Sequence, residues 1–481
     1  MTAAILLLPI VAGLLLPMLK IKNRTVKLSI VFAVLLIEAG LCTIVSVKGF
    51  EPFTLLSMTE TLKIGFAVDR ISKIFMTIAA YGFLLVGTFA FRYMKHSKNE
   101  DLFFCFFLVT EAALMGMDIS ANLITMYLFF EMITLLSMPL VLHDRTKESI
   151  HAALKYLFYS VAGAFLALFC IFVLAQNAST LDFVAGGSVK TASPLVLIAT
   201  FLGVVGFGAK AGMYPLHAWL PTAHPVAPAP ASAVLSAIIA KAGALAIIRI
   251  IFYSAGAEVL RGTWVQMTWI GLALLTVFMG SMMAYREKVF KKRLAYSSVS
   301  QISYALLGLF IMNPTAVTGG VAHIIFHACI KSCLFVVAGS YIFNTGNEKV
   351  DDFNGIGKAM PVTTWAYTFA SLALIGIPPA SGFISKWYLA TGSLDSGITV
   401  YSWLAPVVLI ISALLTAGYL LPITINGFFP KKDKPLVEKN NEGGAIMMIP
   451  IVILSLGTLL MGIFSTPIIK YISEIAEIIA K

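Results

Sequence analysis

The sequence has 481 residues, of which 59% are hydrophobic and 12% are charged. Soluble globular proteins carry about 25% charged residues, so this composition excludes a soluble fold. Apolar runs recur along the chain, each about 20 residues and therefore long enough to cross a bilayer as a helix. The net charge of +11 does not indicate a nucleic-acid partner, because the basic residues lie in short loops between these runs.

The runs predict an all-α polytopic membrane protein that forms a single membrane domain over residues 1–481. We expect about fourteen transmembrane helices. In chain order they lie near 3–19, 27–47, 66–91, 102–119, 121–142, 152–175, 195–219, 229–252, 266–285, 294–312, 316–342, 362–392, 401–427 and 445–468.

Loop charge predicts the orientation of these spans. Lys and Arg gather in the loops after the first, third, ninth and thirteenth spans, at 20–27, 92–98, 286–293 and 431–439. Cytoplasmic loops are enriched in these residues. We therefore expect a multi-pass protein of the cell membrane with both termini outside.

Two spans contain sequences that break a helix. Residues 206–215 (GFGAKAGMYP) end the seventh span, and residues 376–382 (GIPPASG) interrupt the twelfth. Gly and Pro loosen a helix, and a break at membrane depth is tolerated only beside protein or a water-filled cavity. Spans seven and twelve are five apart and so run in opposite directions. This predicts two inverted five-helix repeats, 102–252 (helices 4–8) and 266–427 (helices 9–13).

Ionisable side chains lie deep in the apolar spans. They are Glu131, Lys210, Lys241, His323, His327, Lys331 and Lys386. The two histidines and Lys331 recur every four residues and share one helix face. A charge at the bilayer centre costs roughly 2.5–3.5 kcal/mol, so these groups are expected to face each other or water.

Such a row predicts a path for protons or sodium ions. A Glu131–Lys210 ion pair at about 4 Å would contribute on the order of 4 kcal/mol, enough to decide whether the buried lysine keeps its proton. Histidine titrates near neutral pH and suits a relay between lysines. Three further groups are candidates for gating or ion entry. They are Glu111, His217 and His224.

Simpler interpretations of these residues stay open. Glu131, Lys210 and Lys241 could form static buried ion pairs, and Lys386 could extend to the membrane surface. The two histidines could have a purely structural role, in which they join helices through hydrogen bonds. Glu38 has no assigned partner and suggests a helix or subunit contact.

The sequence predicts neither a metal site nor a cofactor. All five cysteines lie in apolar segments, and Cys329 and Cys333 have no further cysteine ligands elsewhere in the chain. There is no GxGxxG motif in a strand–helix context and no cluster-binding motif.

The residues around the ionisable groups resemble a known family. The relevant stretches are 122–135 (NLITMYLFFEMITL), 206–237 (GFGAKAGMYPLHAWLPTAHPVAPAPASAVLSA), 291–308 (KKRLAYSSVSQISYALLG), 323–335 (HIIFHACIKSCLF) and 376–387 (GIPPASGFISKW). Together they resemble the antiporter-like membrane subunits shared by respiratory complex I, Mrp-type Na⁺/H⁺ antiporters (their D-type subunit) and membrane-bound hydrogenases.

The resemblance implies a fourteen-helix fold with two inverted repeats and a central hydrophilic axis. It implies that Glu131 pairs with Lys210, that Lys241 is the central relay and that Lys386 is the terminal lysine near the exit. His323 and His327 then bridge toward the second half. Thr222 stands where the family usually has Asp, so no role for that acid carries over.

The family also implies partners. These are homologous antiporter-like subunits, small membrane subunits and, in redox complexes, a soluble arm with flavin and iron–sulfur clusters. Any redox chemistry would then belong to the partners. A redox-driven pump and an Mrp-type antiporter subunit both remain open, beside a structural subunit with an inactive channel and a solitary symporter for an organic solute.

Overall fold

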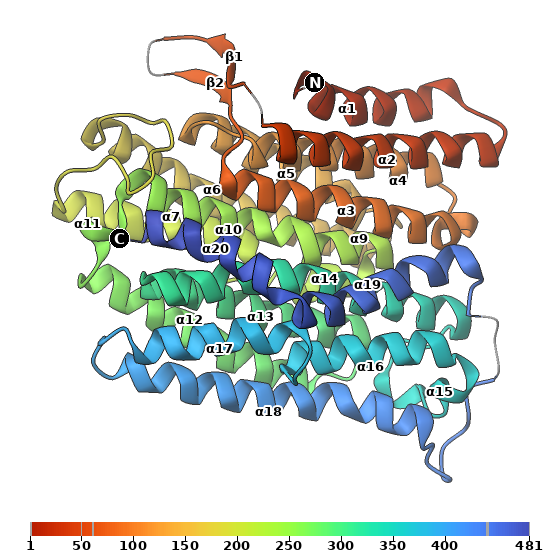
Figure 1. The fold of residues 1–481 in the computed structure, drawn as a ribbon. Coiled ribbons are helices and arrows are strands. Elements are labelled where there is room, and N and C mark those ends of the chain that lie inside the picture. The colour runs from red at the N-terminus through yellow and green to blue at the C-terminus, as the bar shows by residue number, and fades with distance from the viewer. Residues whose placement is uncertain (1, 50, 60–61, 439–441, 481) are drawn as a thin grey trace.

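Helices of similar direction form one elongated bundle in the computed structural model, which describes residues 2–49, 51–59, 62–438 and 442–480 (Figure 1). The first half contains α1 (Thr2–Leu19), α2 (Arg24–Lys48), β1 (Phe53–Ser57), β2 (Lys63–Phe66), α3 (Arg70–Tyr93), η1 (Met94–His96), α4 (Glu100–Asp118), α5 (Leu123–Val141), α6 (Lys147–Asn177), α7 (Pro194–Ala211), α8 (Leu220–Val226), α9 (Ala229–Val234), η2 (Leu235–Ile239), α10 (Ala240–Ile248), η3 (Arg249–Ala255) and α11 (Ala257–Leu260). The second half contains α12 (Trp264–Arg286), α13 (Phe290–Ile311), α14 (Pro314–Thr345), η4 (Val350–Asp352), α15 (Ile356–Ala359), α16 (Pro361–Ile375), α17 (Ser381–Leu394), α18 (Tyr401–Phe428), α19 (Ala445–Ile463) and α20 (Ser465–Ile479).

The prediction of an all-α polytopic membrane fold is confirmed. Eleven helices of the described chain are long and apolar enough to cross a membrane. The remaining expected spans coincide with α1, α4 and the pair α16–α17. The count of fourteen and the two inverted repeats, 102–252 and 266–427, stay predictions.

The start of the third expected span was wrong. Strands β1 and β2 pair in antiparallel fashion, with Phe53 opposite Phe66, so the helix begins at Arg70 and not at residue 66. Asp69 fixes this start because its carboxylate accepts a hydrogen bond from the Ser72 amide, which satisfies a free N–H of the first turn. Asp69 is therefore the N-terminal cap of α3.

Both predicted helix breaks are present. Helix α7 ends at Ala211, where Gly212 takes a left-handed conformation with φ 78°. Helix α16 ends in the same way at Gly376 with φ 94°, and the chain resumes as α17 five residues later. A third irregularity was not predicted: the span expected at 229–252 contains two wide π turns, η2 and η3.

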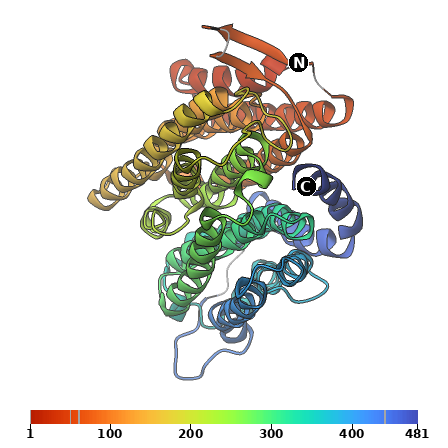
Figure 2. The same cartoon turned by 90° about the vertical axis from the view of Figure 1, so that its left-hand side faces the viewer.

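The most buried helices lie at the centre of the bundle. Seen end-on, the N-terminal helices occupy one side, α12 to α14 the middle and α16 to α18 the other side (Figure 2). The segment Ala229–Ala255 is entirely buried, and α13 and α14 are nearly so, whereas α2, α18 and α19 are about one-third buried. Helix α13 nevertheless carries buried polar residues. They are Ser297, Ser298, Ser300, Gln301 and Ser303.

Helices α6 and α7 approach closely through two glycines. A Cβ added at Gly206 would lie 2.3 Å from the Gly163 carbonyl oxygen, and one added at Gly163 would lie 2.5 Å from the Gly206 oxygen. The backbones are therefore in direct contact just before the turn that carries Lys210. Small residues permit such contacts between membrane helices.

This contact predicts the effect of Gly206→Ala. The added methyl group must separate α6 from α7, and overpacking of this kind costs about 1–3 kcal/mol. Gly40→Ala in α2 is the matched control, because a Cβ added there would meet nothing within 4 Å and alanine favours a helix. Thermal unfolding of the purified chain should show a lower midpoint for Gly206→Ala only; equal midpoints would contradict the close approach.

Candidate functional site

Lys210 lies in the last turn of α7 and is fully buried. Its Nζ donates to the Phe130 carbonyl oxygen at 2.9 Å and to the Thr134 hydroxyl at 2.6 Å, both on α5. The same ammonium lies 4.2 Å from the centre of the Phe130 ring. Backbone, hydroxyl and ring therefore solvate this charge without a carboxylate in contact.

Glu131 follows Phe130 on α5 and is half-buried. Its carboxyl interacts with the Tyr127 hydroxyl, one turn earlier, and electrostatically with Lys210. Its Oε1 atom is buried without a hydrogen-bond partner in the described chain, and no ion pair joins Glu131 to Lys210 there. The structure therefore shows the separated arrangement of the two groups that were expected to pair.

Lys241 is the first residue of the row that contacts another. Its Nζ lies 2.8 Å from His327 Nδ1 and donates to the Ser236 carbonyl oxygen at 2.7 Å. Ser236 belongs to the π turn η2, and a π turn changes which amide a carbonyl meets, a feature common at functional sites. The contact joins α10, in the first predicted repeat, to α14, in the second.

The row continues from His327 to Lys386. The rings of His327 and His323 stack with centroids 5.8 Å apart, and His323 also stacks on Tyr304 at 5.5 Å. His323 Nδ1 lies 2.9 Å from the Ser385 hydroxyl. Lys386, the next residue, places its Nζ 5.0 Å from the centre of the Tyr304 ring.

Lys386 is anchored at the second helix break. Its Nζ donates to the Leu374 and Ile375 carbonyl oxygens at 2.6 and 2.9 Å. These are the last carbonyls of α16, which the break leaves without helical partners. Lys386 is half-buried and points to these carbonyls, which argues against simple extension to the membrane surface.

Lys331 lies beside the row. It is fully buried and donates to the Leu294 carbonyl oxygen at 2.9 Å and to the Ser297 hydroxyl, both on α13. Lys331 and Lys241 repel each other electrostatically. Lys331 shares a helix face with the two histidines. It therefore places a further basic group beside the contact between Lys241 and His327.

The three candidate gating groups lie in separate places. Glu111 is buried in α4. His217 lies between α7 and α8, where its ring stacks on Tyr214 at 5.8 Å. His224 is fully buried in α8, stacks on Phe335 at 4.8 Å and has no hydrogen-bond partner for either ring nitrogen in the described chain. His224 interacts electrostatically with Lys331. His217 lies just after the first helix break, and Glu111 lies on α4, apart from both histidines.

The neutral groups that solvate the charges were not predicted from the sequence. They are the hydroxyls of Thr134, Ser297 and Ser385, the rings of Phe130 and Tyr304, and the carbonyls of Phe130, Ser236, Leu294, Leu374 and Ile375. Among these groups, only the serines of α13 could have been predicted from the sequence, because α13 has the lowest mean hydropathy of the candidate spans. Thr222, at the position where an Asp was expected, accepts a hydrogen bond of 3.0 Å from Lys155.

A further ion pair was also missed. The Arg249 side chain is 3% exposed, binds Asp69 and Ser72, and lies 4.6 Å from the ring centres of Phe183 and Tyr253. Burial alone would raise the pKa of Asp69, but the Arg249 guanidinium and the Ser72 amide together lower it below its usual range. The pair ties the start of α3 to η3.

The sequence as a whole matches a family of membrane proteins. Residues 120–416 match the family described as NADH:quinone oxidoreductase/Mrp antiporter, transmembrane. This segment contains both helix breaks and every residue of the row. The chain therefore belongs to this family, as the motifs predicted.

Individual relatives share most of the chain. It is 32% identical to NADH-quinone oxidoreductase subunit N of Desulforudis audaxviator, over 85% of this chain and 84% of that protein. It is 28% identical to the D-type subunit of the Na⁺/H⁺ antiporter of Bacillus subtilis, over 92% and 89% of the two chains. A chain of the membrane-bound sulfane sulfur reductase, an archaeal respiratory membrane complex, has the same fold with a TM-score of 0.86 at 22% identity, covering 100% of this chain and 98% of that one.

The Asp69–Arg249 pair predicts an acid-dependent contribution to stability. Because the pKa of Asp69 is lowered in the folded state, its stabilisation is present above the unfolded value of about 3.9 and is lost as pH falls through the lower folded value. Asp69→Asn should lower the free energy of unfolding at neutral pH by on the order of 2 kcal/mol, less than for a fully buried pair because the Asp69 side chain is 38% exposed.

The matched control is Glu474→Gln, which removes the exposed ion pair with Arg70 (3.2 Å) at the same end of the bundle. Its effect should stay within about 1 kcal/mol. Denaturation at several pH values measures both variants, and an Asp69→Asn difference that grows as pH falls below 4 would contradict the assignment.

Proposed function

We propose that this chain is an ion-translocating, antiporter-like subunit that moves protons, or sodium ions, along the row from Glu131 to Lys386. The observation that carries the proposal is the chain of contacts Lys241–His327–His323 with Ser385 and Lys386 at its end. Titratable groups in contact at membrane depth are typical of proton relays. Family membership adds independent support.

The geometry suggests how Lys210 would be switched. Here its ammonium binds neutral groups of α5, while Glu131, beside the same Phe130, has a buried oxygen without a partner. A rotation of either side chain would bring the opposite charges together and add on the order of 4 kcal/mol of attraction. The paired state would hold the proton on Lys210, and the separated state would release it toward Lys241.

Helix packing supports transfer between these two lysines. A Cβ at Gly243 in α10 would lie 2.7 Å from both the Phe207 oxygen and the Ala211 nitrogen of α7. Lys241 is thus two residues from a direct backbone contact with the turn that carries Lys210. A conformational change at the first helix break would therefore displace both lysines.

We infer that partner subunits drive the movement through redox chemistry, in the cell membrane and with both termini outside. The relative of highest identity given above is a subunit of an NADH-quinone oxidoreductase. The partners would be homologous antiporter-like subunits, small membrane subunits and a soluble redox arm. This chain would supply the ion path and none of the redox centres.

A role as the D-type subunit of an Mrp-type Na⁺/H⁺ antiporter is the second candidate. The antiporter subunit of Bacillus subtilis covers 92% of this chain, a larger share than the oxidoreductase subunit. Co-purification separates the candidates, because a dehydrogenase or hydrogenase subunit supports the first and further small antiporter subunits support the second.

Lys210→Ala and Lys386→Ala should each lower ion flux in proteoliposomes that contain the complex. A positioned proton-transfer group contributes about 100-fold or more, so we expect losses of that order. Lys95→Ala, at an exposed position after α3, is the control and should retain wild-type flux. Wild-type flux in both buried variants would contradict the residue assignments.

Glu131→Gln separates a switch from a static ion pair. The amide has the same size as the carboxylate but cannot form an ion pair with the Lys210 ammonium. We expect normal assembly, measured by co-purification and thermal midpoint, together with loss of coupled transport. A variant that fails only to assemble would support a static structural role for Glu131.

A further inference from the structure

Two buried carboxyl groups lie outside the proposed ion path. Glu38 in α2 and Glu111 in α4 are both 0% exposed. None of their four carboxyl oxygens has a hydrogen-bond partner among the described residues. Burial of an unsatisfied carboxyl is costly, so their position needs a physical explanation.

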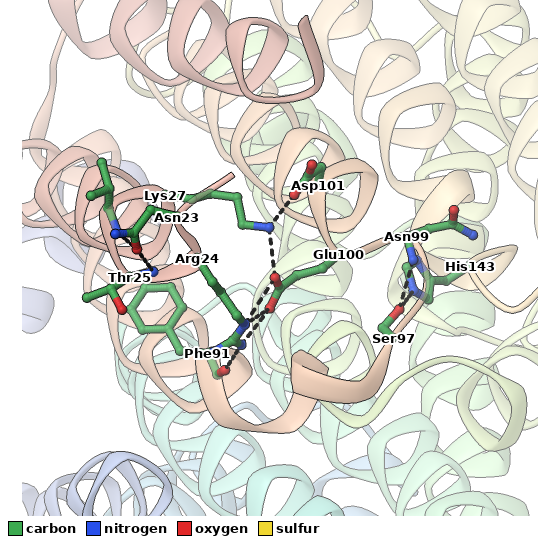
Figure 3. Close-up of polar contacts among 11 residues, drawn as sticks. Asn23, Arg24, Thr25, Lys27, Phe91, Ser97, Asn99, Glu100, Asp101 and His143 are labelled. Carbon is green, nitrogen blue, oxygen red and sulfur yellow. Dashed lines mark hydrogen bonds and ion pairs between the residues drawn. The ribbon is translucent and has the colours of Figure 1, made fainter. Parts of the chain in front are cut away.

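The register of α2 and α4 places these two groups opposite each other. At one end Lys27 Nζ lies 2.8 Å from a Glu100 carboxylate oxygen (Figure 3). Further along, Cys42 Sγ lies 3.8 Å from Met115 Sδ. The numbers of both pairs differ by 73, since 100 − 27 = 73 and 115 − 42 = 73. The helices are therefore parallel and in constant register.

Glu38 and Glu111 differ by the same 73 positions. They lie one turn before the contact between Cys42 and Met115, and 11 residues, or about 16 Å, after the contact between Lys27 and Glu100. The two carboxyls act on each other electrostatically. They therefore occupy matching positions on two helices that contact each other through side chains.

No cation balances this pair among the described residues. Lys27 is bound to Glu100 and Asp101 at the end of the helices. Helix α1 has no ionisable side chain. On α3, the ionisable residue nearest to the level of Glu38 is Tyr81, and its hydroxyl forms a hydrogen bond with the Thr43 hydroxyl. The titratable neighbours are Cys42 and Asp118, which are not cations. Two adjacent carboxylates without a counter-charge repel each other, which disfavours the state in which both are ionised, whereas one proton gives the pair both a donor and an acceptor.

We propose that Glu38 and Glu111 form a proton-sharing carboxyl pair, a second proton-binding site away from the lysine–histidine row. The pair takes one proton from water into an O–H···O hydrogen bond between the two carboxyls and carries a charge of −1 when loaded. Release of that proton to water leaves two carboxylates. The site is a place to hold a proton, and it does not require that the row transports ions.

Polar groups lead from the pair to one end of the bundle. Asp118 lies seven residues after Glu111, two turns along the same face of α4. It is buried and interacts electrostatically with Arg249. Arg249 binds Asp69, whose side chain is 38% exposed, beside the β-hairpin. This series places polar and charged groups between the pair and the hairpin end of the bundle.

Infrared spectroscopy of the full-length chain, with any subunits that co-purify, counts the proton. The integrated C=O stretching band of protonated carboxylic acids at neutral pH should fall by one acid per chain in the double variant Glu38→Gln/Glu111→Gln. Glu51→Gln, an exposed acid, is the matched control and should change nothing. A fall of zero or of two acids overturns the proposal, because both groups are then ionised or both independently protonated.

Two further measurements keep the test decisive. Either single Gln variant should remove the broad absorption of a proton shared by two oxygens, which settles the question if the double variant does not fold. Sodium chloride, compared with choline chloride, should not raise the thermal midpoint of the wild type more than that of the double variant. A sodium-specific rise lost in the double variant overturns the proposal in favour of a Na⁺ site. None of these readouts depends on transport, so failure here is distinct from failure of the proposed ion path.

Discussion

The physical constraint behind this structure is the solvation of lysine side chains in the interior of the bundle by backbone carbonyl oxygens. Five buried or half-buried lysines each bind a backbone carbonyl oxygen, whereas the buried Lys27, at one end of the bundle, binds the carboxylates of Glu100 and Asp101. The pairs are Lys210 with Phe130, Lys241 with Ser236, Lys291 with Ala227, Lys331 with Leu294, and Lys386 with Leu374 and Ile375. A carbonyl dipole stabilises the charge but holds it less tightly than a carboxylate would. Such lysines are held in place and can still lose a proton.

Irregular helix geometry supplies many of these carbonyls. Leu374 and Ile375 end α16, Ala227 follows α8, and Ser236 lies in a π turn. A regular helix would use those oxygens for its own hydrogen bonds. The breaks therefore create acceptors at membrane depth, which explains why broken helices and buried lysines occur together. Close helix contacts at glycines keep the broken segments aligned.

Acidic groups have a different distribution from the basic row. Glu131 begins the row beside Lys210, whereas Glu38, Glu111 and Asp118 lie with α2 and α4, on the side of the bundle that carries the N-terminal helices. In the described part of the chain, carboxylates contact cations directly only at the bundle ends, as in Glu100 with Lys27 and Asp69 with Arg249. Unlike charges are therefore separated in the interior of the described bundle, as the proposed ion path and the proposed carboxyl pair require.

The sequence by itself determined the membrane class, the helical fold, the two breaks and the family, because apolar runs and Gly–Pro motifs act locally along the chain. It also predicted the charged residues of the row, since an ionisable residue in an apolar span is conspicuous. Only the tertiary structure decided what each charge contacts. The Phe130 carbonyl for Lys210, the π turn under Lys241 and the constant register of Glu38 with Glu111 depend on helix packing. Backbone carbonyls have no sequence signature, and register between distant helices is set by side-chain contacts across the interface.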